Sequence, residues 1–332
     1  MQKILIIQTA FIGDVVLATA LVEKLHIYFP EVAIDFLVRK GNESLLDNNP
    51  LINEVIVWDK KINKNKNLLR LVGKTIAAKY DKVINLQRFF STGLLTTLSG
   101  AKETIGFTKN PLSWLFSRRV KHEIDLENPK HEVNRNHALI AHFTDDVTAL
   151  PKLYPSVKDH QVIKPYLNDS FITITPSSVW FTKKYPVEKW KDFIDQIDPL
   201  FKIYLLGGKE NVEEANDLAT NSANKNVEVL AGKLSFLQSA ELMKYAKMNY
   251  VNDSAPLHFA SAVNAPVTAI FCSTVPKFGF TPLSNISHVV ETTVKLECRP
   301  CGLHGYKACP LSHFKCAYTI TTDQLLYTLN NG

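Results

Sequence analysis

Short apolar runs of strand length alternate along this chain with segments whose apolar residues recur at helical spacing. In the N-terminal half, residues 14–29 form such a helical segment, with Leu17, Leu21 and Leu25 on one face and Pro30 directly after it. The strand-like runs of this half lie at 3–8, 33–38, 54–58 and 82–86. Strands and helices in alternation require a mainly parallel sheet with helices on both faces. The chain is therefore predicted to have an α/β fold.

The alternation is interrupted once, between Pro151 and Asp169, and then resumes. The interruption holds three prolines and few apolar runs, which is typical of a linker. After it, strands are predicted at 171–175, 202–206, 227–230, 250–251 and 267–271, and helices at 187–197, 212–221, 235–246, 254–263 and 322–329. A chain of 332 residues is long enough for two domains. We predict two Rossmann-like domains, at 1–160 and 170–316, and a terminal helical segment at 317–332.

Charge and hydropathy limit where the chain acts. Its net charge of +6 favours anionic ligands such as nucleotides, phosphorylated lipids or a membrane surface, although ordinary surface lysines give the same value. The apolar run at 4–7 is followed by Gln8 and Thr9 and by no cleavage site, so we interpret it as a buried strand and not as a signal peptide. No run reaches the ~18 apolar residues that span a bilayer. We expect a cytoplasmic protein.

Two acidic residues lie where a predicted strand passes into a helix. Ligands of open parallel sheets bind beyond the carboxyl ends of the strands, and both Asp14 and Asp253 lie at such ends. Asp14, with Gly13 before it, is either a helix cap or a carboxylate that accepts a proton. A helix N-terminus lowers the pKa of a carboxyl group, so we expect Asp14 to be ionised. The loop before it matches neither a dinucleotide fingerprint nor a P-loop, which disfavours an oxidoreductase or an NTPase.

The segment 252–258 is suited to binding phosphate. Asp253 is expected to cap the helix that follows, and the helix dipole favours a diphosphate at its start. The expected donors are the backbone N–H groups of Ser254, Ala255 and Leu257 and the side chains of Ser254 and His258. A plain capped helix is the simpler interpretation of the same residues.

Basic residues near the strand ends offer further contacts to anions. Lys183 and Lys184 lie between a strand and a helix, where a lysine can stabilise a leaving phosphate as a point charge, although a solvated lysine pair fits nearly as well. Arg88, Arg118 and Arg119 lie in the N-terminal half. They can hold an anionic acceptor, or they can be ordinary surface arginines.

Four of the five cysteines occupy one segment near the C-terminus. They are Cys298, Cys301, Cys309 and Cys316. A cytosolic location argues against disulfide bonds. Four thiols can hold a structural zinc ion, but the second C-x-x-C pair of a usual zinc site is missing. We favour reduced cysteines that pack a loop-rich segment, with structural zinc as the alternative.

Several motifs, taken in order, resemble glycosyltransferase family 9, the ADP-heptose:lipopolysaccharide heptosyltransferases. They are Phe11 to Leu17, Ile105-Gly106-Phe107 with Asn110-Pro111, Ser178-Val179-Trp180 with Thr182-Lys183, Leu205 to Gly208, Ala231 to Ser235, Asn252-Asp253-Ser254 with His258, and the cysteine segment. Their order and spacing cover nearly the whole chain.

This resemblance implies a GT-B fold, in which two Rossmann-like domains with parallel sheets face each other across a cleft and the terminal helix returns to the first domain. It implies inverting transfer of a heptose from an ADP-sugar to an anionic glycolipid acceptor of the lipopolysaccharide inner core. No metal or other cofactor is required for this chemistry, and no nucleic acid takes part. The enzyme is expected at the cytoplasmic face of the inner membrane, in peripheral contact with it.

The resemblance also implies roles for single residues. Asp14 is similar to the general base that deprotonates the acceptor hydroxyl, and Lys183 is similar to a ligand of the donor diphosphate. The implied acceptor-binding residues are Gly13, Arg88, Arg118 and Arg119. The implied donor-binding residues are Ser177, Ser178, Lys183, Asn211, Leu234, Asp253, Ser254, Ala255, Leu257 and His258.

Three departures from the family pattern lie in the predicted donor site. The family commonly has Gly where this chain has Ala255, Gly-Pro where it has Cys272-Ser273, and Pro-Gly-Ser where it has Pro176-Ser177-Ser178. A small side chain in place of glycine narrows the approach of a ligand to the backbone. The donor sugar or its base can therefore differ from ADP-heptose. A nucleotide-sugar epimerase or a nucleotide-sugar-binding protein of the same fold is the alternative, and the latter would not need Asp14.

Overall fold

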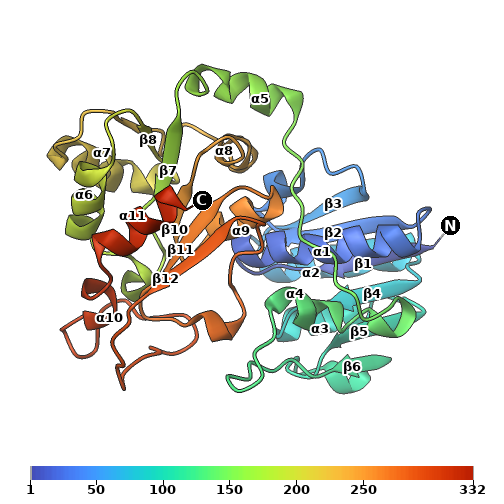
Figure 1. Ribbon diagram of the computed structural model, residues 1–332. Helices are drawn as coiled ribbons and strands as arrows, with labels where there is room; N and C mark the ends of the chain where they lie inside the picture. The colour runs from blue at the N-terminus through green and yellow to red at the C-terminus, as the bar shows by residue number, and fades with distance from the viewer. Residues whose placement is uncertain (1, 332) are drawn as a thin grey trace. The chain divides into compact units, whose positions relative to one another are not determined.

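Each half of the chain folds around a parallel sheet of its own. The computed structural model describes residues 2–331, and the chain divides into two units between Tyr154 and Pro155. Within the described residues each unit contains one sheet of six strands, with helices between consecutive strands (Figure 1). The prediction of an α/β fold with two parallel sheets is therefore confirmed.

The first unit has the strand order β3-β2-β1-β4-β5-β6, and all neighbouring strands are parallel. Its strands are β1 (Lys3–Ile7), β2 (Ala33–Arg39), β3 (Ile52–Trp58), β4 (Lys82–Asn85), β5 (Glu103–Phe107) and β6 (Arg118–Val120). Its α-helices are α1 (Ile12–Tyr28), α2 (Lys64–Ala78), α3 (Phe90–Thr97) and α4 (Glu132–His137), and its 3-10 turns are η1 (Glu43–Leu46), η2 (Ser113–Leu115) and η3 (Ala141–Phe143).

The second unit repeats this arrangement, with the strand order β12-β11-β10-β7-β8-β9. Its strands are β7 (Phe171–Thr175), β8 (Lys202–Leu205), β9 (Val227–Val229), β10 (Asn249–Asn252), β11 (Val267–Phe271) and β12 (Ser287–Glu291). Its α-helices are α5 (Val157–Ile163), α6 (Val187–Gln196), α7 (Val212–Asn221), α8 (Phe236–Met243), α9 (Ala255–Ala262), α10 (Lys315–Tyr318) and α11 (Thr322–Asn330). The 3-10 turns are η4 (Lys164–Tyr166), η5 (Phe181–Lys183), η6 (Lys209–Asn211) and η7 (Pro276–Phe278).

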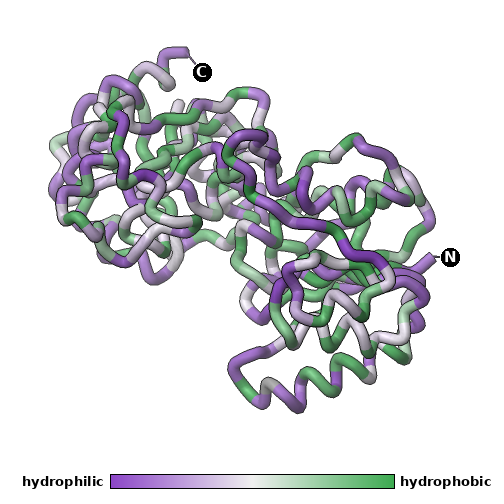
Figure 2. Tube along the Cα trace, turned by 90° about the horizontal axis from the view of Figure 1, so that it is seen from below, coloured by the Kyte–Doolittle hydropathy of each residue, from purple (hydrophilic) through white to green (hydrophobic). Residues whose placement is uncertain are grey.

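The central strands are apolar along their length because helices cover both faces of each sheet. In β1 the residues Ile4 to Ile7 are fully buried, and every residue of β7 and β11 is buried. Figure 2 shows hydrophobic stretches in the interior of each unit. This pattern explains why continuous apolar runs located these strands in the sequence.

Both strand orders reverse direction at one point, and that point fixes where a ligand can bind. In the first unit the reversal lies between β1 and β4, and in the second unit it lies between β7 and β10. Open parallel sheets bind ligands at the carboxyl ends of the strands that flank such a reversal. Ligands are therefore expected at the loops that follow β1, β4, β7 and β10.

The C-terminal helix α11 packs on the core of the second unit, within which all of its contacts described here lie. Leu325 and Leu329 are buried in the same core cluster as Tyr250, and α11 packs against α6 and β12. The Tyr250 hydroxyl donates to the Leu325 carbonyl at 3.1 Å, and Thr268 donates to Thr328 at 2.8 Å. The apolar face of α11 is thus satisfied within its own unit.

The helix α5 also belongs to the second unit, although the sequence placed its residues in and near the linker. Ser156 accepts from the Asp159 amide, and the Asp159 side chain accepts from the Ser156 amide, which forms a capping box. The helix packs on α8, where His160 lies 3.0 Å from Glu241. The pair Ser156 and Asp159 was the available signal, because a serine three residues before an acidic residue is typical of a helix start.

Candidate active site

Asp14 lies in the first turn of α1, directly beyond the carboxyl end of β1. The N-cap of α1 is Phe11, whose side chain makes no cap hydrogen bond, so Asp14 is the third residue of the helix and not its cap. Its carboxylate accepts from the backbone N–H groups of Phe11 and of Asp14 itself. Gly13 precedes it in the same turn. The interpretation of Asp14 as a cap residue is therefore wrong, and the carboxylate lies at the strand reversal of the first unit.

The pKa of Asp14 is raised to about 6, opposite to the direction expected from the sequence. Burial of the carboxyl group is the largest cause, and the negative charge of Glu132 adds to it. The Phe11 amide and the Lys109 ammonium oppose these effects without cancelling them. A carboxyl group with a pKa near 6 is a far better proton acceptor at neutral pH than an ordinary aspartate.

Glu132, which raises the pKa of Asp14, is itself held firmly. It begins α4, which packs against α1, and only 7% of it is exposed. Its carboxylate lies 3.1 Å from His122 Nε2 and accepts from Arg135 Nε at 2.7 Å. Burial would raise the pKa of Glu132, but its contacts with His122 and Arg135 lower it overall. Sequence reasoning missed both Glu132 and Lys109, because nothing in their local pattern connects them to Asp14.

The three predicted acceptor arginines do not lie in one place. Arg88 is exposed in the loop after β4, at the strand reversal, with its guanidinium 5.6 Å from the Phe89 ring. Arg118 and Arg119 are exposed on the edge strand β6, two strands away from β4. The structure therefore brings only Arg88 to the same sheet ends as Asp14.

In the second unit, Lys183 and Asp253 form a largely buried ion pair. Lys183 follows β7 and Asp253 follows β10, so both lie at the strand reversal. The Lys183 ammonium is 2.7 Å from Asp253 Oδ2, and the two side chains are 16% and 9% exposed. Thr274, in the loop after β11, donates its hydroxyl to the same Asp253 oxygen at 2.6 Å. A lysine ammonium has three donors, so this pairing leaves donors for an anion.

The sequence suggested that Asp253 caps α9. In the structure Asp253 instead pairs with Lys183 and does not cap the helix. The N-cap of α9 is Ser254, whose side chain makes no cap bond and instead donates to the Asn252 carbonyl at 3.3 Å. The Leu257 amide donates to the Ser254 carbonyl at 3.1 Å, and Leu257 is fully buried. The backbone N–H of Leu257 is therefore not available to a phosphate. Ala255 remains half-buried in the first turn.

Several of the remaining predicted donor residues have partners within the second unit. Ser177 donates to Glu214 at 3.0 Å, and Lys184 lies 3.1 Å from the same carboxylate. Asn211 accepts from the Gly208 amide at 3.1 Å and so shapes the turn after β8. Ser178 and Leu234 are half-buried, and His258 is 6% exposed with its ring 6.4 Å from that of Phe280. The two adjacent lysines are thus distinct, because only Lys183 pairs with Asp253.

The cysteine segment contains free thiols. Cys316 is buried in the core of the second unit, and burial raises its pKa to about 12. Cys301 donates to the Cys298 carbonyl at 3.4 Å, and burial followed by the charges of Cys298 and Cys309 raises its pKa. Across residues 2–331, no group of three or more histidines, cysteines and acidic residues is arranged to hold a metal ion.

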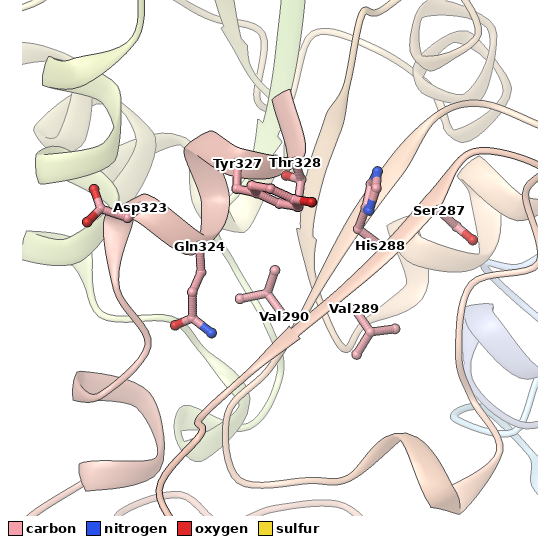
Figure 3. A pocket seen from close by; sticks show the side chains of 8 residues that line it. All are labelled: Ser287, His288, Val289, Val290, Asp323, Gln324, Tyr327 and Thr328. Carbon is pink, nitrogen blue, oxygen red and sulfur yellow. The ribbon is translucent and has the colours of Figure 1, made fainter. Parts of the chain in front are cut away.

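A surface pocket of about 550 Å³ lies elsewhere, beside the edge strand β12 and α11 (Figure 3). Its lining residues are Ser287, His288, Val289, Val290, Asp323, Gln324, Tyr327 and Thr328. None of them follows a strand at the reversal of the sheet, and none was predicted from the sequence. We therefore do not assign the transfer chemistry to this pocket.

The family of the chain follows from its sequence. Residues 69–306 match the family model described as glycosyltransferase family 9 (heptosyltransferase). The chain belongs to glycosyltransferase family 9. It is therefore a glycosyltransferase of the heptosyltransferase type, as the motifs indicated. The matched region includes Lys183, Asp253 and Glu132, and Asp14 lies before it.

Relatives of this family 9 enzyme match it over most of their length. Lipopolysaccharide heptosyltransferase 3 of Escherichia coli is 26% identical over 278 residues, which are 80% of this chain and 82% of that protein. The glycosyltransferase family 9 structure from Veillonella parvula has a TM-score of 0.85 at 21% identity and covers 100% of this chain and 98% of its own. The E. coli ADP-heptose lps heptosyltransferase II has a TM-score of 0.80 at 23% identity, with 99% and 98% covered. These structures confirm the GT-B fold class.

Proposed function

We propose that this family 9 enzyme transfers a heptose from ADP-heptose to a sugar of the lipopolysaccharide inner core, with inversion at the anomeric carbon. The observation that carries the proposal is Asp14, a carboxyl group with a pKa near 6 at the strand reversal of the first unit. The donor and the acceptor class rest on the similarity to the lipopolysaccharide and ADP-heptose heptosyltransferases of E. coli. The ion pair of Lys183 and Asp253 supports a site for a diphosphate.

The proposed reaction is one displacement. Asp14 takes the proton from the acceptor hydroxyl, whose oxygen forms a bond to the anomeric carbon of the heptose. The bond from that carbon to the diphosphate oxygen breaks at the same time, and ADP leaves. Lys183 and the start of α9 stabilise the negative charge that grows on the leaving diphosphate. These protein groups supply the stabilisation that the reaction needs, so we assign no step to a metal.

Assays of ADP release test this proposal directly. We expect ADP release from ADP-heptose only when an inner-core acceptor is present, and we expect it to persist in EDTA. UDP- and GDP-sugars serve as controls for the nucleobase of the donor, because Ala255 and Ser177 stand where the family commonly has glycine. If ADP release depended on an added divalent cation, this would contradict the assignment of Lys183 as the group that stabilises the leaving diphosphate. Turnover of a UDP- or GDP-sugar in preference to ADP-heptose would contradict the donor.

We further propose that the first unit contacts an anionic membrane surface through exposed aromatic side chains beside arginine. Phe89, Phe90 and Trp114 are 49%, 59% and 67% exposed, and Arg88 lies against the Phe89 ring. Asn110 joins the start of α3 to the start of η2, since it donates to the Phe89 carbonyl at 3.1 Å and accepts from the Leu112 amide at 2.9 Å. Aromatic rings with adjacent cations are typical of peripheral membrane contacts. The described residues include no helix that is long and apolar enough to cross a membrane.

Sedimentation with vesicles checks this contact. We expect Trp114→Ser to reduce binding to vesicles that contain anionic lipid, because an exposed indole loses its place at the lipid interface. Leu200→Ser is the matched control, since Leu200 is 82% exposed in the second unit. The binding should also weaken as salt is raised. Equal binding by the wild type and the Trp114 variant would refute this surface.

A further inference from the structure

The loop that follows β11 is organised by the cysteine segment. Arg299 donates to the carbonyls of Phe271, Cys272 and Thr274 at 3.1, 2.8 and 2.7 Å. The Cys301 amide donates to the Ser273 carbonyl at 2.9 Å. Four consecutive carbonyls, from the last residue of β11 into this loop, therefore accept from two residues of one segment. Such a pattern fixes the backbone of the loop, because each carbonyl has a partner of defined direction.

The same segment also contacts the residue before Lys183. The Thr182 amide donates to the Tyr306 carbonyl at 3.1 Å, and the Tyr306 amide donates to the Thr182 hydroxyl oxygen at 2.7 Å. Ser273 donates to that hydroxyl oxygen at 3.0 Å. Gly305 has a φ of +75°, and a Cβ at this position would lie 2.8 Å from Thr182 Oγ1 and 3.1 Å from Lys183 Cγ. The approach of the segment to Lys183 thus requires glycine.

The loop after β11 contains Thr274, whose hydroxyl contacts Asp253, the ionic partner of Lys183. Thr274 is 1% exposed, and its Oγ1 donates to Asp253 Oδ2, the same oxygen that pairs with the Lys183 ammonium. A chain of direct contacts therefore runs from Arg299 through Thr274 and Asp253 to Lys183. All of these contacts lie within the second unit.

We propose that Arg299 and Thr274 are positioning residues for Lys183. Arg299 fixes the loop after β11, the Thr274 hydroxyl fixes the Asp253 carboxylate, and Asp253 holds the lysine ammonium in one place. This inference rests on the proposed function, in which Lys183 stabilises the leaving diphosphate. A lysine side chain is a flexible four-carbon stem with a point charge at its end, so its catalytic value depends on what holds it.

The first test measures the position of Lys183 without any substrate. An amine-acetylating reagent is applied to the folded protein, and the modification of Lys183 is quantified by mass spectrometry. We expect acetylation of Lys183 to rise severalfold in Thr274→Val and in Arg299→Lys, because the lysine is released from Asp253. Thr274→Ser keeps the hydroxyl and should match the wild type. Thr268→Val is the matched control, because it removes a buried hydroxyl bond to Thr328 in the same unit.

The second test measures the consequence for transfer. We expect Thr274→Val to lower kcat by about tenfold to 100-fold, as for a reacting group that is slightly misplaced, with a smaller change in the KM for the donor. In a Lys183→Ala background the same substitution should have no further effect, because its only route to the chemistry is lost. A purely structural role would instead lower kcat in Thr268→Val as well.

The outcomes separate the two proposals. Unchanged acetylation of Lys183 in Thr274→Val overturns the positioning role, whatever the activity. An additive loss of kcat in the Lys183→Ala background overturns it as well. Increased acetylation in a protein whose wild type transfers no heptose would support the positioning role and contradict the proposed function alone.

Discussion

Asp14→Asn is expected to lower the rate of heptosyl transfer by about 10²–10⁴-fold, the usual contribution of a general base. The amide cannot accept the proton of the acceptor hydroxyl. Binding of ADP should stay intact, because the predicted donor residues all lie in the second unit. Transfer assays and ADP calorimetry on the same preparations check both parts. Asp47→Asn, an exposed change in the same unit, is the control. Wild-type turnover by the Asp14 variant would rule out this base.

The raised pKa of Asp14 also predicts a pH dependence. Below about pH 6 the carboxyl group is protonated and cannot act as a base, so kcat/KM should fall about tenfold per pH unit on the acid side. Glu132→Gln should move this limb to lower pH, because it removes a negative charge that raises the pKa of Asp14. If the acid side of the pH profile of kcat/KM kept its position in Glu132→Gln, this would contradict the assigned role of Glu132.

Asp14→Asn should stabilise the folded protein although it removes the transfer activity. The pKa of Asp14 in the folded chain is about 6, above the ordinary value of 3.8, so the ionised carboxylate disfavours folding. This cost appears as pH rises from about 4 to 6 and reaches at most ~3 kcal/mol above pH 6. Asp14→Asn should therefore raise the melting temperature by a few degrees at pH 8. The gain should disappear as the pH falls toward 4.

Lys183→Ala is the second large effect that we expect. Removing one preorganised group that stabilises a leaving anion typically costs about 10²–10³ in kcat. The neighbouring Lys184 pairs with Glu214 and not with Asp253, so Lys184→Ala is the matched control and should retain most activity. Steady-state kinetics with varied donor distinguishes the two lysines. Equal losses in both variants would contradict the assignment.

Loss of the lysine also leaves the Asp253 carboxylate buried and without its ionic partner. Breaking a buried ion pair on one side typically costs about 3–5 kcal/mol of stability, although the Thr274 hydroxyl remains in contact. The double variant Lys183→Ala, Asp253→Asn should regain much of this stability, because it removes the unpaired charge. Its transfer rate should remain low. Recovery of activity in the double variant would show that the single variant had failed by unfolding.

The sheet architecture was predictable because it depends on local patterns. Short segments rich in apolar and β-branched residues located β7 and β11, and helical spacing gave α7 with its observed bounds. The edge strand β12 was missed, because its residues are partly exposed and form no apolar run. The location of Asp14, Lys183 and Asp253 at strand ends also followed from the pattern. Their local order in the chain was enough to place them.

The interactions of these residues could not be predicted, because their partners lie far away in sequence. The expected low pKa of Asp14 considered only its own helix, whereas burial and Glu132 of α4 decide its value. Asp253 was assigned as a cap because aspartate commonly has that role, but it pairs with Lys183. Arg299 gave no signal at all, since its proposed role depends on three backbone carbonyls that only the folded chain brings together.

The repeated strand order has a consequence for how such enzymes diversify. One topology serves twice in this chain, and the proposed base and the proposed diphosphate ligand occupy equivalent loops of the two copies. Each copy has its own core and its own network, with Glu132 behind Asp14 in one and Thr274 behind Asp253 in the other. With these proposed roles, substitutions near Asp14 in the first copy leave the residues around Lys183 in the second copy unchanged. The acceptor and the linkage can then change during evolution while the sugar donor stays the same.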